Sequence, residues 1–237
     1  HSAQTLLLPK RSQATQTLYN ALIHALRNNT QSLRHLSVPW EQATADALQA
    51  MFNCRRLHSL TLGTEHHNGI STVDLKPLER LRSLTMIVSS KHLGRAILCA
   101  HPELEQLTAP PEVLDEATLS VLPKLRVLRL KTRLWNASLF ALQQVASASL
   151  SELRELHLED DHARLILPDK DAPLRLERLE RLTAHHYDDE FKWANVQLPA
   201  LTFLHTRITG LRLIAPATPN LTQLRIAGDL YNALADF

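Results

Sequence analysis

The sequence Leu-Arg-Val-Leu-Arg-Leu at residues 125–130 decides the fold, because close variants of it recur along almost the whole chain. Every copy has leucine at positions 1 and 4, and nearly every copy has an apolar residue at position 6. Nine copies spaced 20 to 28 residues apart predict stacked structural units, each of which covers part of its neighbour's core. The hexads begin at Leu33, Leu57, Leu81, Leu104, Leu125, Leu153, Leu179, Leu201 and Leu221.

Each hexad has the alternation of a short strand. Side chains at positions 4 and 6 point to one face, and those at positions 3, 5 and 7 point to the other. One repeat cannot bury its apolar face alone, whereas parallel strands stacked side by side share a continuous core. Each buried leucine contributes roughly 1.5–3 kcal/mol, against a backbone ordering cost of roughly 1–2 kcal/mol per residue. We therefore expect the leucines of every repeat to be needed for folding.

The hexads resemble those of the leucine-rich repeat family, from about residue 30 to the end of the chain. The chain departs from the family three residues after each hexad, where an Asn or Cys is usual and none is present. Segments with a Pro-x-Leu pattern before four hexads look like those of ribonuclease-inhibitor-like and F-box-associated repeats. These segments are HPELEQL (101–107), LPKLRVL (122–128), LPALTFL (198–204) and TPNLTQL (218–224).

The connections between hexads differ along the chain. In the first half their apolar residues recur every three or four positions, which predicts helices, with Asp115 and Asn136 at N-cap positions. A similar stripe between Ala14 and Leu26 predicts a helix that caps the N-terminal end of the array. After Leu153 the connections carry Pro and charge with little periodicity. The helices predicted between hexads span residues 43–53, 91–100, 115–122 and 136–149.

Together these patterns predict an α/β solenoid, a curved leucine-rich repeat array of about nine repeats. Its parallel sheet would be concave, with helices on the convex side in the first half and irregular connections in the second. We expect one domain over residues 1–237, with a capping helix in 1–30 and repeats in 31–237. Few residues follow the last hexad, so either the array continues past Phe237 or Leu230, Leu234 and Phe237 begin a closing helix.

The composition favours an intracellular protein, in the cytoplasm or nucleus. No stretch of 18 apolar residues is present, so we expect no membrane span. The first residues lack a basic segment followed by a long apolar run, and therefore do not look like a signal peptide. Cys54 and Cys99 lie about two repeats apart, too far for a disulfide, so we expect reduced, buried thiols.

The exposed face of the predicted sheet changes character along the array. Position 5 holds Ser or Thr in the first four hexads, and Arg or His in most of the later ones. Arginines and aromatic residues in a mixed polar surface are typical of protein-binding sites. We therefore predict a protein partner on the concave face, bound by Trp40, Ile87, Arg129, Lys131, Glu155, His157, Arg181, His185, Phe203, His205, Arg207 and Arg225.

Other functions are less well supported by the sequence. His157, His185 and His205 fall on three neighbouring strands, but imidazoles alone are a weak indication of zinc. The formal net charge is only +2 and acidic residues are interleaved with basic ones, which argues against nucleic acid. No nucleophile elbow, phosphate-binding loop or His-Glu-x-x-His motif is present, so we expect neither an enzyme nor a cofactor.

Two alternatives to a general binding module remain open. The resemblance to F-box-associated repeats implies that the chain could be the substrate-recognition part of a ubiquitin ligase receptor. An inhibitor that occludes an enzyme would use the same face. In each case we expect a chain that is monomeric on its own.

Overall fold

The computed structural model describes residues 4–7, 16–38, 45–64, 78–88, 91–131, 138–141, 145, 148, 150–158, 163–166, 174–184, 186–187, 196–207 and 217–227. These residues fall into two compact units, His1–Leu114 (unit 1) and Asp115–Phe237 (unit 2). No described helix is long and apolar enough to cross a membrane.

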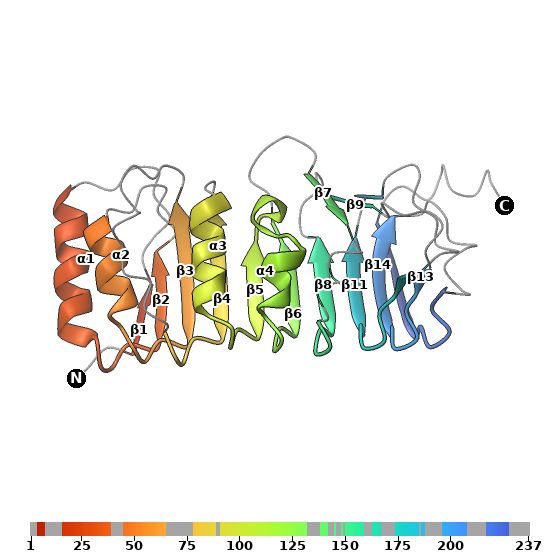
Figure 1. Ribbon diagram of the computed structural model, residues 1–237, viewed down its shortest axis with the longest axis horizontal. Coiled ribbons are helices and arrows are strands. Elements are labelled where there is room, and N and C mark those ends of the chain that lie inside the picture. The colour runs from red at the N-terminus through yellow and green to blue at the C-terminus, as the bar shows by residue number, and fades with distance from the viewer. Residues whose placement is uncertain are drawn as a thin grey trace. The chain divides into compact units, whose positions relative to one another are not determined.

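Every hexad contains a strand, and every strand pair described in either unit is parallel (Figure 1). The predicted α/β class with parallel strands is therefore confirmed. A further strand, which the sequence analysis did not predict, precedes the first hexad. The main strands of unit 1 are β1 (Thr5–Leu7), β2 (His35–Val38), β3 (Ser59–Thr64), β4 (Ser83–Val88) and β5 (Gln106–Ala109), and those of unit 2 are β6 (Val127–Leu130), β8 (Glu155–Leu158), β11 (Arg181–Ala184), β14 (Phe203–Arg207) and β15 (Gln223–Ala227).

The strands pair so that equivalent hexad positions lie side by side. Leu36 pairs with Leu60 in unit 1, and Leu156 pairs with Leu182 in unit 2. This register stacks the position-4 leucines into one row within each unit, and those from Leu36 to Leu204 are at most 2% exposed. The row ends at β15, where Leu224 is 43% exposed.

Each hexad is introduced by a tight turn, which explains the Pro-x-Leu pattern. The amide of Leu125 donates to the carbonyl of Leu122, so Pro123 occupies the second turn position, where its fixed φ is favourable. At position 2 one backbone carbonyl accepts two amides of the next repeat: Arg154 accepts from Glu180 at 2.8 Å and from Arg181 at 2.9 Å. The same pair of hydrogen bonds recurs within both units and fixes the repeats in register.

Helices fill the described connections of unit 1. The helices predicted at 43–53 and 91–100 are confirmed as α2 and α3, and the helix predicted before the first hexad forms as α1. α1 packs against α2, and α3 lies along β4 (Figure 1). Their apolar faces supply the remainder of the core. These elements are α1 (Gln16–Asn29), α2 (Ala45–Phe52), α3 (Lys91–Ala100) and the 3-10 turn η2 (Pro111–Val113).

Unit 2 contains helix α4 (Glu116–Ser120), and Asp115 caps this helix as predicted. The Asp115 carboxylate accepts the amide of Thr118 at 2.9 Å, and the Thr118 hydroxyl accepts the amide of Asp115 at 3.2 Å. This reciprocal pair is a capping box and satisfies two amides that the first helical turn leaves unpaired.

The helix predicted at 136–149 is wrong for residues 138–141, which form strand β7 (Ser138–Ala141). Asn136 lies outside the described residues. β7 pairs in parallel with a strand of the following connection, so pairing between neighbouring repeats overrides the local helical spacing. The connections predicted as irregular also contain four short strands, two of which form a three-stranded sheet with β7 while the other two pair with each other. These strands are β9 (Ala163–Ile166), β10 (Leu174–Arg175), β12 (His186–Tyr187) and β13 (Val196–Gln197).

The two cysteines are free, but only one of them is buried. Burial raises the pKa of the Cys54 thiol to about 11, and this thiol lies 3.5 Å from the carbonyl oxygen of Ala50. Cys99 is exposed, so the prediction that it is buried is wrong. It lies on α3, whose buried residues include Ile97 and Leu98, and the buried position three residues before its hexad belongs to His101 instead.

Candidate functional site

The candidate site lies on the face of the unit 2 strands to which hexad positions 3 and 5 point. We call this face the open face of unit 2. Positions 4 and 6 of β6, β8 and β11 are buried, whereas positions 3 and 5 remain partly or fully exposed. The strands β8, β11 and β14 lie side by side (Figure 1). Their register therefore brings side chains that are 20 to 30 residues apart in sequence into contact.

Glu155 is the centre of a small polar network. Its carboxylate lies 3.0 Å from Nε2 of His157, and Nδ1 of the same ring lies 3.1 Å from the hydroxyl of Thr183 on the next strand. The tautomer with its proton on Nε2 satisfies both contacts, since the ring then donates to Glu155 and accepts from Thr183. The imidazole is thus held by one partner on its own strand and by another on the adjacent strand. We call these three residues the Glu155 network.

Two arginines flank this network at longer range. Nη2 of Arg129 and Nε of Arg181 each lie 4.0 Å from an oxygen of Glu155. At this separation, on a surface reached by water, an ion pair is weak. Glu155 therefore offsets part of the positive charge of both arginines. It lies too far from Nε of Arg181 to accept a hydrogen bond from it.

Phe203 links the network to the last strands of the unit. The guanidinium carbon of Arg181 lies 4.4 Å from the centre of the Phe203 ring, and that of Arg225 lies 5.5 Å from it. Both distances are within the range of cation–π attraction. Phe203 is only 6% exposed, whereas Arg181 and Arg225 are exposed, so a molecule at this face contacts the two arginines rather than the ring. We call these three residues the Arg–Phe–Arg stack.

Of the twelve residues predicted for the site, six are brought together by described side-chain contacts. They are Arg129, Glu155, His157, Arg181, Phe203 and Arg225. Lys131 is exposed directly after β6, and His205 pairs in register with Thr183 and Arg225. Ile87 and Arg207 lie in the strands β4 and β14. Trp40 and His185 lie outside the described residues.

Thr183 was not among the predicted site residues, although it belongs to the same position-5 row. Its strand register opposite His157 could have indicated this contact, because the hexads align these two positions. Two ion pairs at the strand starts were also missed. Arg154 lies 2.9 Å from Glu180, and Arg178 lies 2.8 Å from Glu152. All four side chains are largely exposed, so we expect little stability from these pairs.

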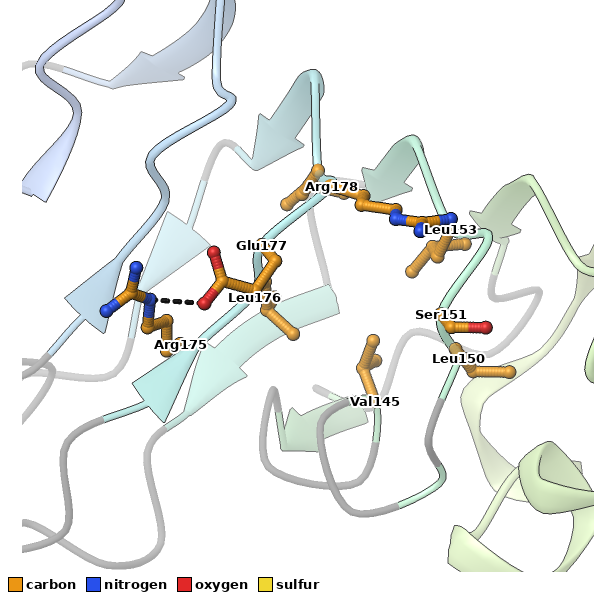
Figure 2. Close-up of a pocket in the computed structure, with 9 residues that line it drawn as sticks. Val145, Leu150, Ser151, Leu153, Arg175, Leu176, Glu177 and Arg178 are labelled. Atoms are coloured by element: carbon orange, nitrogen blue, oxygen red, sulfur yellow. Dashed lines mark ion pairs between the residues drawn. The ribbon is translucent and has the colours of Figure 1, made fainter.

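Unit 2 also has a hollow, which lies away from the Glu155 network. Its volume is about 320 Å³, and Val145, Leu150, Leu153, Leu176 and Leu179 form its apolar lining. Figure 2 shows the side chain of Leu176 pointing toward Val145. Charged groups lie around these leucines, and one pair of them is an ion pair of 2.5 Å between Arg175 and Glu177. None of the predicted site residues lines this hollow.

The described part of the open face carries a mixture of charged, polar and aromatic groups. Among the described residues, no group of three or more His, Cys, Asp or Glu side chains is placed to hold a metal ion. The described residues at its centre provide planar guanidinium donors, one carboxylate, one fixed imidazole and one shielded aromatic ring. Such groups can bind polar and charged surfaces of another molecule.

Comparison with models of known protein families gives no match, and comparison with curated proteins gives none either.

Proposed function

We propose that this chain is a non-enzymatic protein–protein interaction module of the leucine-rich repeat type, which binds a protein partner on the open face of unit 2. The observation that carries the proposal is the contrast between the two sides of the same strands. Position 4 holds the leucines that the core requires, and position 6 is buried in most strands, whereas positions 3 and 5 hold a connected cluster of Arg, Glu, His and Phe. Of the Arg, Glu, His and Phe side chains in this cluster, only Phe203 is buried.

The arrangement suits binding without large rearrangement. Backbone hydrogen bonds between repeats fix the spacing of the strands, and the side-chain contacts restrict His157, Arg181 and Phe203. Side chains that are already ordered lose less conformational entropy on binding, which leaves more of the interaction energy for affinity. Arginine and aromatic residues are also the types that most often dominate binding energy at protein interfaces.

Site-specific photo-cross-linking tests the proposal. The photoreactive amino acid p-benzoylphenylalanine would replace Lys131, which is exposed directly after β6. In a matched control it would replace Lys124, which is exposed in the turn before the same strand. Both variants would be irradiated in a lysate of the native cells, and the adducts would be separated by mass and identified.

A discrete adduct at position 131 that is missing at position 124 supports binding on the open face. The same adducts at both positions, or none at position 131, overturn the proposal. The captured protein would also separate the remaining alternatives. A ligase adaptor together with substrates points to a ubiquitin ligase receptor, and a single stoichiometric enzyme points to an inhibitor.

A further inference from the structure

We infer that the partner presents an acidic segment, rich in Asp or Glu, to the Arg–Phe–Arg stack of unit 2. This inference rests on the proposed function and adds the chemistry of the partner. It depends on the charge of the open face, on the geometry of the stack and on the spacing between its two cations.

The open face of unit 2 has an excess of positive charge. Its described residues at positions 3, 5 and 7 include four cationic side chains, Arg129, Lys131, Arg181 and Arg225, against one carboxylate, Glu155. The whole chain of 237 residues has a formal net charge of only +2. The described part of this face therefore carries more positive than negative charge, which favours a negatively charged partner surface.

The stack holds two guanidinium groups ready to bind carboxylates. The contact with the Phe203 ring is an attraction between a cation and a ring face, which needs no N–H to oxygen hydrogen bond from either guanidinium group. Glu155 lies 4.0 Å from Nε of Arg181, too far for a hydrogen bond. In the part of the chain that the structure describes, no carboxylate forms an ion pair with Arg225. A partner carboxylate can therefore form the paired N–H to oxygen contacts that arginine favours.

The spacing fits an extended acidic segment. Arg181 and Arg225 lie on β11 and β15, and their guanidinium carbons lie 4.4 and 5.5 Å from the centre of the same Phe203 ring, so these two carbons are at most about 10 Å apart. An extended peptide advances about 3.3 Å per residue, and acidic side chains two or three residues apart therefore span about 7 to 10 Å. Two carboxylates of one segment can reach both guanidinium groups.

The same face fits nucleic acid less well. Glu155 interrupts the cationic row at its centre and would repel a phosphate backbone. The Phe203 ring is nearly buried beneath two guanidinium groups, so it cannot serve as a stacking platform for a base. Both features are compatible with carboxylate side chains that approach each arginine separately.

Fluorescence anisotropy with a labelled peptide of ten glutamates tests the inference. The key variant is R181Q/R225Q, and the matched control is R55Q/R56Q, which removes the same two charges from exposed positions of unit 1. At about 0.1 M salt we expect the key variant to bind the peptide at least tenfold more weakly than the unaltered chain. We expect the control variant to stay within about twofold of it. R181K/R225K, which keeps the charge but loses the planar donors, should fall between them.

Equal losses in both glutamine variants, or no loss in either, overturn the inference. A ten-nucleotide single-stranded DNA that binds more tightly than the peptide overturns it as well and points to nucleic acid. Cross-linking at position 131 shows whether only the inference of an acidic segment fails or whether the proposed binding on the open face fails too. If the adduct persists in R181Q/R225Q and excess glutamate peptide does not compete, the partner uses the open face without acidic recognition. If no adduct forms at all, the proposed function itself fails.

Discussion

Units 1 and 2 use the same hexad to build their cores, yet they differ on the open face and in the connections. The open face of unit 1 presents Ser and Thr at position 5, namely Ser37, Thr61, Thr85 and Thr108, and the equivalent row of unit 2 holds Arg129, His157, Thr183, His205 and Arg225. Elsewhere in the described residues, helices α1, α2 and α3 lie in connections of unit 1, and short strands occur in connections of unit 2. The stacking of leucines therefore leaves the connections and the open face free to vary.

This difference assigns separate roles to separate rows of residues. Mutations in the leucine rows should destabilise both units alike, because the rows are equivalent. Mutations in the connections should act differently in the two units, because helices and short strands pack in different ways. Mutations on the open face should change binding in unit 2 with little effect on folding.

The largest effect is expected in the shared leucine rows. Leu60→Ala in unit 1 and Leu156→Ala in unit 2 should each lower the free energy of unfolding by about 2–5 kcal/mol, because each leaves a cavity in a closed core. Leu224→Ala, at the same hexad position on the partly exposed β15, should cost well under half as much. Urea unfolding would measure all three. A large loss of unfolding free energy for one of Leu60→Ala and Leu156→Ala, with a small loss for the other, would show that the leucine rows of the two units are not equivalent.

A smaller loss is expected where a helix of unit 1 packs closely against its neighbour. A Cβ on Gly94 of α3 would lie 2.8 Å from Cγ1 of Val113 in η2. Gly94→Ala should therefore lower the free energy of unfolding by about 1–3 kcal/mol, although alanine normally favours a helix. The double variant G94A/V113A should recover part of this loss in thermal unfolding. If G94A alone stabilises the protein, the close packing of α3 on η2 is wrong.

The helix of unit 2 should be less sensitive. Asp115→Ala removes the capping box of α4 and should cost about 1 kcal/mol, a usual value for the loss of an N-cap. Asp115→Asn keeps a side-chain oxygen for the Thr118 amide and should recover most of that stability. A loss well above 2 kcal/mol in chemical unfolding would show that Asp115 has a role beyond capping.

Much of this architecture could be predicted from the sequence. The hexads gave the strands and the buried rows, because a period of two residues within each hexad and a regular spacing between hexads are strong signals. Helix α3 and the cap at Asp115 also followed from local patterns. The strand β7 could not be predicted in this way, because its conformation depends on pairing with β9, a connection of the next repeat.

The candidate site was only partly predictable. The alternation within each hexad placed Arg129, His157 and Phe203 on one face, and strand register then brought residues of that face together. The burial of Phe203 under two arginines could not be read from the sequence, since it depends on side-chain conformations across three strands. This detail changes the expected contact surface from an aromatic ring to a pair of guanidinium groups.

The cores of the two units should respond differently to acid, because the core of unit 1 contains a buried histidine. His101 is 3% exposed, its Nδ1 lies 2.6 Å from the carbonyl of Ile97, and its Nε2 has no hydrogen-bond partner among the described residues. Burial lowers the pKa of His101 below its usual 6.5, with the Ile97 contact opposing that shift. Below pH 6.5 the unfolded chain therefore takes up a proton that the folded chain does not, and stability should fall with pH until the folded pKa is reached.

Five other repeats carry leucine at the position of His101, including Leu122 in unit 2, and this allows a reciprocal exchange. H101L should flatten the dependence of the free energy of unfolding on pH between pH 6.5 and 5, with little change at pH 7.5. L122H should introduce the same acid sensitivity into unit 2 and lower stability at all pH values, because it buries a polar ring where a leucine packs. Urea unfolding at several pH values would measure both slopes. If H101L leaves the pH dependence of the free energy of unfolding unchanged, the protonation of another group governs stability in acid. The two cores then do not differ in acid sensitivity because of His101.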